Sequence, residues 1–90
     1  MSWSIDFYSE GVRLAIEALP VGIRASHARA MGDGLFELRL RGAEGIARVF
    51  YCARIGRRIV VLHVFIKKTE ETPKRELAIA RRRQREISKS

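Results

Sequence analysis

The sequence predicts an α+β fold in which a small antiparallel sheet packs on an N-terminal helical hairpin and carries a basic helix at the C-terminus. Three observations indicate this fold. Apolar residues recur at helical spacing before residue 32, and they alternate with other residues after residue 34. Short glycine-containing segments separate the alternating runs. A cationic stretch with helical periodicity ends the 90-residue chain, whose length suits a single domain over residues 1–90.

The first third of the chain predicts one strand and two helices. Residues 3–7 alternate apolar and polar side chains, which is typical of a short edge or first strand with one buried face. Ser9 can cap a helix that begins at Glu10, and apolar residues then recur at helical spacing until Pro20 ends it. Residues 21–31 predict a second helix of about three turns, which completes the helical hairpin.

Three strand-like runs follow a turn at residues 32–34: Leu35–Arg41, Ile46–Ile55 and Ile59–Lys67. The segments between them are short and contain glycine, so we expect hairpins and an antiparallel meander. Strict alternation gives this meander one apolar face, which should pack on the N-terminal helices. That face comprises Phe36, Leu38, Leu40, Ala47, Val49, Tyr51, Ala53, Val60, Leu62, Val64 and Ile66.

The opposite face of the meander carries basic residues from three strands: Arg39, Arg48, His63 and Lys67. Alternation determines the face within each strand but not the register between strands, so their convergence is an inference. Positive charges around a phosphate stabilise the negative charge that grows in a transition state. His63, or a lysine whose pKa is lowered by neighbouring cations, can transfer protons. These four residues are the predicted catalytic site.

The last helix is predicted from Pro73 to about Ile87, with Thr72 as its capping residue. Residues 34–90 contain fifteen basic and six acidic residues, against three and four in residues 1–33. The net charge of +8 therefore lies in the C-terminal two-thirds and favours a polyanionic partner. The candidate nucleic-acid-binding residues are Lys68, Lys74, Arg81, Arg82 and Arg85.

The composition disfavours several classes of protein. Cys52 is the only cysteine, so the chain can form no internal disulfide and has no pair of cysteines for zinc. The acidic residues are scattered without the spacing of a divalent-cation site, so we expect neither a metal nor another cofactor. An export signal and a long apolar stretch are both absent, which predicts a cytoplasmic protein with no membrane partner.

Metal-free RNA cleavage is a chemistry that suits such a cationic site. It needs a base near the ribose 2′-hydroxyl, cations around the phosphate and an acid for the leaving 5′-oxygen, and it produces a cyclic phosphate. The residues alone also allow structural roles. A histidine in an apolar strand can be a packing residue, and paired lysines at a strand end can simply block edge pairing.

Four motifs occur in order along the C-terminal two-thirds of the chain. They are Gly34-Leu35-Phe36-Glu37-Leu38-Arg39, Arg48-Val49-Phe50-Tyr51, the run from Ile59 to Lys68, and Thr72-Pro73 followed by Glu76 and Ala80. Together they resemble the phage-derived HigB-like toxins of the RelE/ParE superfamily. The resemblance implies a type II toxin that cleaves mRNA on the ribosome and is neutralised by a helix-turn-helix antitoxin. The positions that are basic or polar in the family correspond to Arg39, Arg48, His63, Lys67 and Lys68.

One segment departs from these toxins. Residues 23–32 join the first helix almost directly to the first motif, whereas the toxins have a longer second helix. Such a shortening leaves apolar sheet surface uncovered, which favours a homodimer, or it marks a toxin that no longer works. Two alternatives to the nuclease stay open. One is a toxin that poisons DNA gyrase by binding, and the other is a non-catalytic module that binds nucleic acid.

Overall fold

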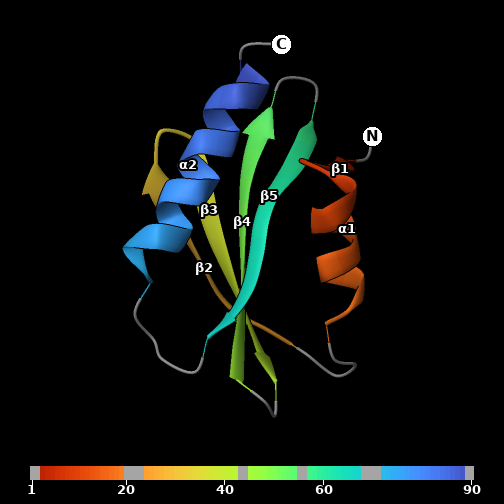
Figure 1. The fold of residues 1–90 in the computed structure, drawn as a ribbon, viewed down its shortest axis with the longest axis vertical. Coiled ribbons are helices and arrows are strands. Elements are labelled where there is room, and N and C mark those ends of the chain that lie inside the picture. The colour runs from red at the N-terminus through yellow and green to blue at the C-terminus, as the bar shows by residue number, and fades with distance from the viewer. Residues whose placement is uncertain (1–2, 20–23, 43–44, 55–56, 68–71, 89–90) are drawn as a thin grey trace.

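The computed structural model describes residues 3–19, 24–42, 45–54, 57–67 and 72–88 of the chain. Within these residues, a five-stranded sheet has one helix on each face (Figure 1). The elements are β1 (Ser4–Phe7), α1 (Glu10–Glu17), β2 (Arg24–Gly32), β3 (Leu35–Gly42), β4 (Gly45–Arg54), β5 (Arg58–Lys67) and α2 (Lys74–Ser88). The α+β class is confirmed, and β3, β4, β5 and α2 begin and end within one residue of the predicted positions.

The sheet is mixed, with the strand order β1-β5-β4-β3-β2. β2, β3, β4 and β5 pair with one another in antiparallel fashion, and the predicted meander is confirmed for β3 to β5. β1 lies at an edge, as expected, but it runs parallel to β5, with Ser4 opposite Arg58 and Phe7 opposite Val61. The prediction of a wholly antiparallel sheet was wrong, because alternation within a strand carries no information about its direction or its partner.

Residues 24–32 form strand β2 and not the second helix that the sequence predicted. The expected helical hairpin is therefore wrong over these residues. β2 pairs with β3, with Ala28 opposite Leu38 and Ala30 opposite Phe36. Alanine favours a helix, but the main-chain hydrogen bonds offered by β3 outweigh that preference. Two register shifts along β2 also disturb its side-chain period, which hides the strand pattern in the sequence.

A tight turn joins β2 to β3. Gly32, Asp33 and Gly34 all have positive φ, at 92°, 54° and 78°. This left-handed conformation is easy for glycine and tolerated by aspartate, so the three residues suit a sharp reversal of the chain. The expected turn is confirmed, although it connects two strands and does not end a helix.

α1 packs on one face of the sheet, over β5 and β1 (Figure 1). Ser9 caps this helix as predicted, because its Oγ accepts a hydrogen bond from the Val12 amide at 3.2 Å. Val12 is buried against Val49 and Val61. The partly buried residues around them are Phe7, Tyr8, Ile16, Leu38, Leu40 and Val64.

The buried face predicted for the first strand was only partly right. Trp3 and Ile5 are 55% and 60% exposed, whereas Phe7 packs into the cluster beneath α1. β1 is an edge strand with a single neighbour, β5. Alternation alone therefore overestimated how much of its apolar side is covered.

α2 packs on the opposite face of the sheet. Ala80 is fully buried against Phe50 and Leu62. Leu77 and Ile87 pack against the same cluster, so the helix turns a narrow apolar stripe toward the sheet. Apart from Ala78 and Ile79, the other residues of the helix are polar or charged, and its outer side faces solvent.

A β-bulge interrupts the alternation of β5. His63 pairs with Phe50, but Val61 pairs with Tyr51, so Leu62 is an extra residue on β5. An inserted residue puts two successive side chains on one side of the strand. Sequence alternation cannot detect such an insertion, because His63 is the only polar residue among the apolar residues around it.

The bulge changes which side chains pack against which helix. Val60 and Leu62 pack with α2, whereas Val64 packs in the α1 cluster. Strict alternation predicted one face for all three residues, and that prediction was wrong for Val60 and Leu62. His63 lies on the α2 face together with them, since it contacts residues of α2.

Gly34→Ala is expected to destabilise the fold, whereas Gly11→Ala is expected to stabilise it. At the φ of 78° of Gly34, a side chain costs about 1–2 kcal/mol. Gly11 lies in the first turn of α1, where alanine gains up to about 1 kcal/mol over glycine. Its added Cβ would meet Ser9 Oγ at an ordinary 3.6 Å. Denaturant titration of both variants measures the two signs, and a stabilised Gly34→Ala would contradict the turn conformation.

Candidate functional site

Cross-strand rows on the α2 face bring three of the predicted site residues together. Arg39 on β3 lies directly opposite Arg48 on β4. In the neighbouring row, Phe50 on β4 lies opposite both Glu37 on β3 and His63 on β5. Side chains of paired residues project from the same face of a sheet. Arg39, Arg48 and His63 therefore share one face, while their roles stay predictions.

Arg48 is enclosed by the residues around it. Its side chain is 0% exposed. Its Nη1 donates to Thr72 Oγ1 at 3.0 Å and lies 3.8 Å from Glu37 Oε2. The Thr72 hydroxyl in turn donates to Glu37 Oε2 at 2.8 Å. Thr72 was expected to cap α2. Its hydroxyl instead hydrogen-bonds to Arg48 on β4 and Glu37 on β3, which links the segment before the helix to these two strands.

The carboxylate of Glu37 is buried among arginines. Arg39 Nε donates to its Oε1 at 3.0 Å, and Arg29 Nε lies 3.5 Å from the same oxygen. Burial alone would raise the pKa of Glu37. Hydrogen bonds from Thr72 and Arg39, with the charges of Arg39 and Arg48, outweigh burial and hold that pKa below its ordinary value. The carboxylate is therefore ionised at neutral pH.

His63 is held by two residues of α2. Its Nε2 lies 3.1 Å from Glu76 Oε2, and its Nδ1 lies 3.4 Å from Arg83 Nη1. Arginine can only donate hydrogen bonds, so Nδ1 is the acceptor in the neutral tautomer that fits these partners. Nε2 then carries the proton, and its N–H donates a hydrogen bond to Glu76. Arg83 also donates to the carbonyl oxygen of Leu62 at 2.8 Å and lies 4.7 Å from the centre of the Tyr8 ring. A carboxylate and a guanidinium therefore fix the orientation of the imidazole.

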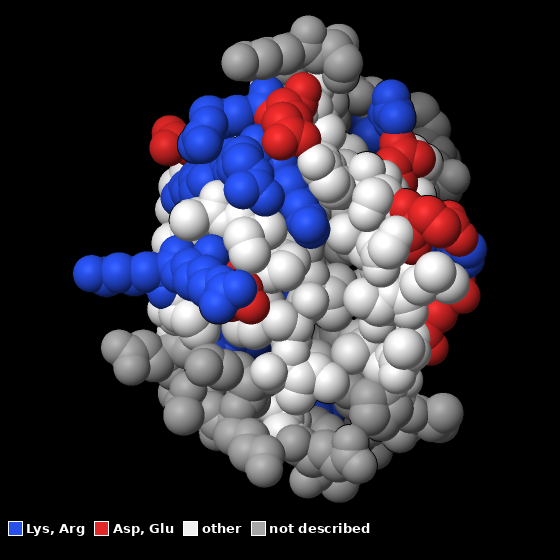
Figure 2. Space-filling view, viewed as in Figure 1, with Lys and Arg blue, Asp and Glu red and all other residues white. Residues whose placement is uncertain are grey.

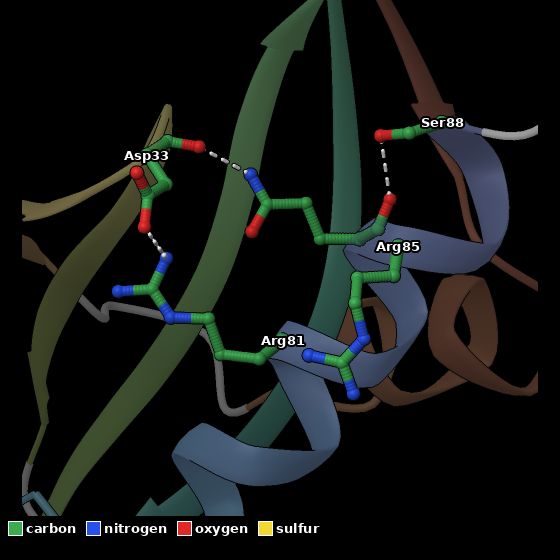
Figure 3. A pocket seen from close by; sticks show the side chains of 5 residues that line it. Asp33, Arg81, Arg85 and Ser88 are labelled. Atoms are coloured by element: carbon green, nitrogen blue, oxygen red, sulfur yellow. Dashed lines mark hydrogen bonds and ion pairs between the residues drawn. The ribbon is translucent and has the colours of Figure 1, made fainter.

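Two side chains from the middle and the second half of α2 hold the β2–β3 turn. Arg81 donates to the carbonyl oxygens of the last two residues of β2 at 2.6 and 2.8 Å, and Gln84 donates to that of Asp33 at 2.7 Å. A pocket of about 470 Å³ lies here, lined by Asp33, Arg81, Gln84, Arg85 and Ser88 (Figure 3). Arg81 points at the turn and not into solvent, so it contributes to the fold as well as to the charge of the surface.

The outer side of α2 is cationic. The exposed cations along it are Lys74, Arg75, Arg82 and Arg85. Figure 2 shows lysine and arginine gathered over this helix, while a group of acidic side chains lies toward α1. Three of the predicted nucleic-acid-binding residues, Lys74, Arg82 and Arg85, therefore share one exposed surface. Arg81 lies at its inner border.

Two predicted residues at the end of β5 are less fully described. Lys67 pairs with Ile46, which belongs to the next row beyond Arg48. This register is compatible with the prediction that Lys67 shares a face with Arg39 and Arg48, but only the backbone of Lys67 is described. Lys68 lies outside the described residues.

The described part of the chain contains no group of three or more His, Cys, Asp or Glu residues arranged to hold a metal ion. None of its helices is long and apolar enough to cross a membrane. Cys52 is buried in the apolar cluster beneath α2.

Sequence comparison relates the chain to a known protein family. The family described as Phage derived protein Gp49-like (DUF891) matches residues 10–85. The chain belongs to this family. No curated protein matches it. The Gp49-like proteins are a RelE/HigB-like toxin family, so the resemblance found in the sequence motifs is confirmed at this level.

Several residues that build this face of the Gp49-like protein were missed by sequence reasoning. Glu37 and Glu76 were regarded as scattered acids. A signal for Glu37 existed, because residues two apart on a strand point to the same side and Glu37 precedes Arg39 by two. Glu76 had no such signal, since its contact with His63 joins a helix to a strand.

Acidification is expected to destabilise the Gp49-like protein through Glu37. The pKa of Glu37 in the folded chain is below its ordinary value of 4.5. Its ionised form therefore contributes stability that is fully present above pH 4.5 and is lost as pH falls through the folded pKa. Denaturant titration at successively lower pH should show a shallower loss of unfolding free energy for Glu37→Gln than for the wild type.

Glu10→Gln is the matched control for this measurement. Glu10 is exposed and pairs with Arg13 at the surface, where ion pairs contribute little. Its substitution should leave most of the acid-induced loss of stability in place. The same slope in wild type and Glu37→Gln would contradict the account of the buried carboxylate.

Proposed function

We propose that this Gp49-like protein is the toxin of a type II toxin–antitoxin pair and that it cleaves mRNA on the ribosome without a metal. The proposal rests on the row formed by Arg39 and Arg48, with His63 in the neighbouring row, beside a helix whose outer side is cationic. Family membership supports a toxin, and the cationic surface supports an RNA substrate.

The proposed reaction begins when a base removes the proton of the ribose 2′-hydroxyl. The 2′-oxygen attacks the adjacent phosphorus, the bond from phosphorus to the 5′-oxygen breaks, and an acid protonates that oxygen. The products carry a 2′,3′-cyclic phosphate and a 5′-hydroxyl. Negative charge grows on the phosphate oxygens during the attack, so a guanidinium beside them lowers the barrier.

Arg39 is the proposed direct contact to the scissile phosphate. The Arg39 side chain is 12% exposed. The Arg48 side chain on the neighbouring strand has no exposed surface, so it would act on the phosphate only through its positive charge. His63 or Lys67 is proposed to transfer protons. The hydrogen bond between His63 and Glu76 supports the histidine, because a carboxylate that orients an imidazole is a recurring feature of general bases. In this role Nδ1 takes the proton, and the substrate replaces Arg83 Nη1, which lies 3.4 Å from it.

Four cations of α2 are proposed to hold the RNA backbone: Lys74, Arg81, Arg82 and Arg85. Lys68, which lies outside the described residues, is proposed to do the same. Phosphate contacts of this kind give affinity without sequence preference. The proposed protein partners are a helix-turn-helix antitoxin and the ribosome. Large exposed apolar side chains in the described residues, Trp3, Ile5, Leu14 and Ile66, support contact with the antitoxin or with a second copy of the chain.

The complete burial of Arg48 favours one alternative, a non-catalytic module that binds nucleic acid through α2. In that case Arg48 and Glu37 only stabilise the fold, and the chain binds RNA without turnover. The gyrase-poisoning alternative has no observation in the structure that favours it.

Induction of the wild-type chain in bacteria is expected to arrest growth and create new mRNA 5′ ends within translated messages. Arg39→Ala should remove both effects, because the phosphate loses its proposed contact. Arg13→Ala is the matched control, since it removes an exposed arginine on α1, away from this surface. Sequencing of RNA 5′ ends provides the measurement, and circular dichroism checks that the variants fold.

The same experiment separates the alternatives. Growth arrest with intact messages and a DNA-damage response would contradict the nuclease and select the gyrase poison. A chain that neither arrests growth nor cuts messages, yet binds RNA, would select the non-catalytic module.

RNA binding is expected to weaken steeply with salt. For single-stranded RNA, each phosphate contact contributes a slope of about 0.7 to the plot of log affinity against log salt concentration. Arg82→Ala and Arg85→Ala should each lower this slope by about that amount, and Arg13→Ala should leave it unchanged. Fluorescence anisotropy with a labelled RNA measures the slopes. An unchanged slope in both α2 variants would exclude this helix as the RNA-binding surface.

A further inference from the structure

Glu37 is a charged side chain with no exposed surface, one row away from the proposed phosphate contact. A buried carboxylate is costly unless it is paired and hydrogen-bonded. Thr72 and Arg39 hydrogen-bond to it at 2.8 and 3.0 Å, and nitrogens of Arg29 and Arg48 lie 3.5 and 3.8 Å from its oxygens. Because it is buried, Glu37 cannot touch RNA in this arrangement and can affect a reaction only through these partners.

The two oxygens of this carboxylate hold two arginines that would otherwise repel each other. Arg39 and Arg48 lie directly opposite on neighbouring strands, where like charges are unfavourable. Glu37 Oε1 accepts from Arg39 Nε, and its Oε2 faces Arg48 Nη1. A hydrogen bond at Nε restricts rotation of the planar guanidinium group. The direction in which Arg39 presents its other N–H groups therefore depends on Glu37.

Thr72 extends this cluster to α2. Its hydroxyl accepts from Arg48 and donates to Glu37, so the chain two residues before the helix is tied to β3 and β4 at the same point. The first turn of α2 then carries Glu76, which holds Nε2 of His63. The proposed phosphate contact and the proposed proton-transfer residue thus depend on one buried support.

We infer that Glu37 is a positioning residue of the proposed cleavage site. It orients Arg39 toward the scissile phosphate and, through Thr72, holds the start of α2 against the sheet. Arg48 belongs to the same buried support and does not touch the substrate. This inference rests on the proposed function, because Glu37 has a reaction to assist only if the chain cleaves RNA.

The test compares Glu37→Gln with the wild-type chain on purified ribosomes that translate a defined mRNA. Glutamine keeps the size of the side chain but removes its charge. We expect kcat to fall by up to about 100-fold, since a displacement of about 1 Å in a catalytic group can cost that much. KM should stay near the wild-type value, because the RNA-binding side of α2 is unchanged.

Thr72→Val and Thr72→Ser form the second arm of the test. Valine has nearly the shape of threonine without the hydroxyl, and serine keeps the hydroxyl. We expect Thr72→Val to lower kcat with little change in KM and Thr72→Ser to restore it. Arg13→Ala should keep the wild-type kcat, because it lies outside the site. Circular dichroism gives the folded fraction, and all rates are expressed per folded molecule.

The outcomes distinguish this inference from the function on which it rests. A wild-type kcat per folded molecule in both Glu37→Gln and Thr72→Val would overturn the positioning role and leave the nuclease in place. If Glu37→Gln does not fold, the comparison of the two Thr72 variants decides, and equal rates overturn the inference. A wild-type chain that cleaves no message would overturn both.

Discussion

The buried charge of Glu37 constrains the whole α2 side of the sheet, because a carboxylate that water cannot reach must keep its partners close. Those partners come from three strands and from the segment that precedes the helix: Arg29, Arg39, Arg48 and Thr72. Removing one partner of such a buried pair typically costs about 3–5 kcal/mol. Burial of the apolar cluster around Phe50 favours packing of α2 on the sheet, but it does not determine the position of the helix along the strands. The polar cluster around Glu37 determines where along the strands the helix begins.

The fold was predictable where side-chain period and backbone signals agreed. β3 to β5 and α2 have clear periods bounded by glycine or by Pro73, and the structure reproduces them closely. β2 was not predictable in this way, because its alanines favour a helix and only the neighbouring β3 makes a strand the better choice. The direction of β1 was equally hidden, since its partner β5 lies far away along the chain.

For the candidate site, alternation correctly grouped Arg39, Arg48 and His63 on one face. It failed for Val60 and Leu62, because the bulge in β5 adds a residue without changing the apolar character of the strand. The burial of Arg48 could not be foreseen either. It depends on Glu37 from another strand and on Thr72 from the segment before α2. The residue pattern of β4 alone does not indicate these contacts.

The parallel pairing of β1 with β5 also determines when the chain can fold during its synthesis. Asp6 on β1 forms an ion pair with Arg58 on β5, and the two lie 52 residues apart in the chain. β1 and α1 are therefore made first but find their packing surface only after β5 has been added. α2, which closes the other side of the sheet, ends at Ser88 of 90 residues. The cationic face is thus assembled only after both β5 and α2 have been made.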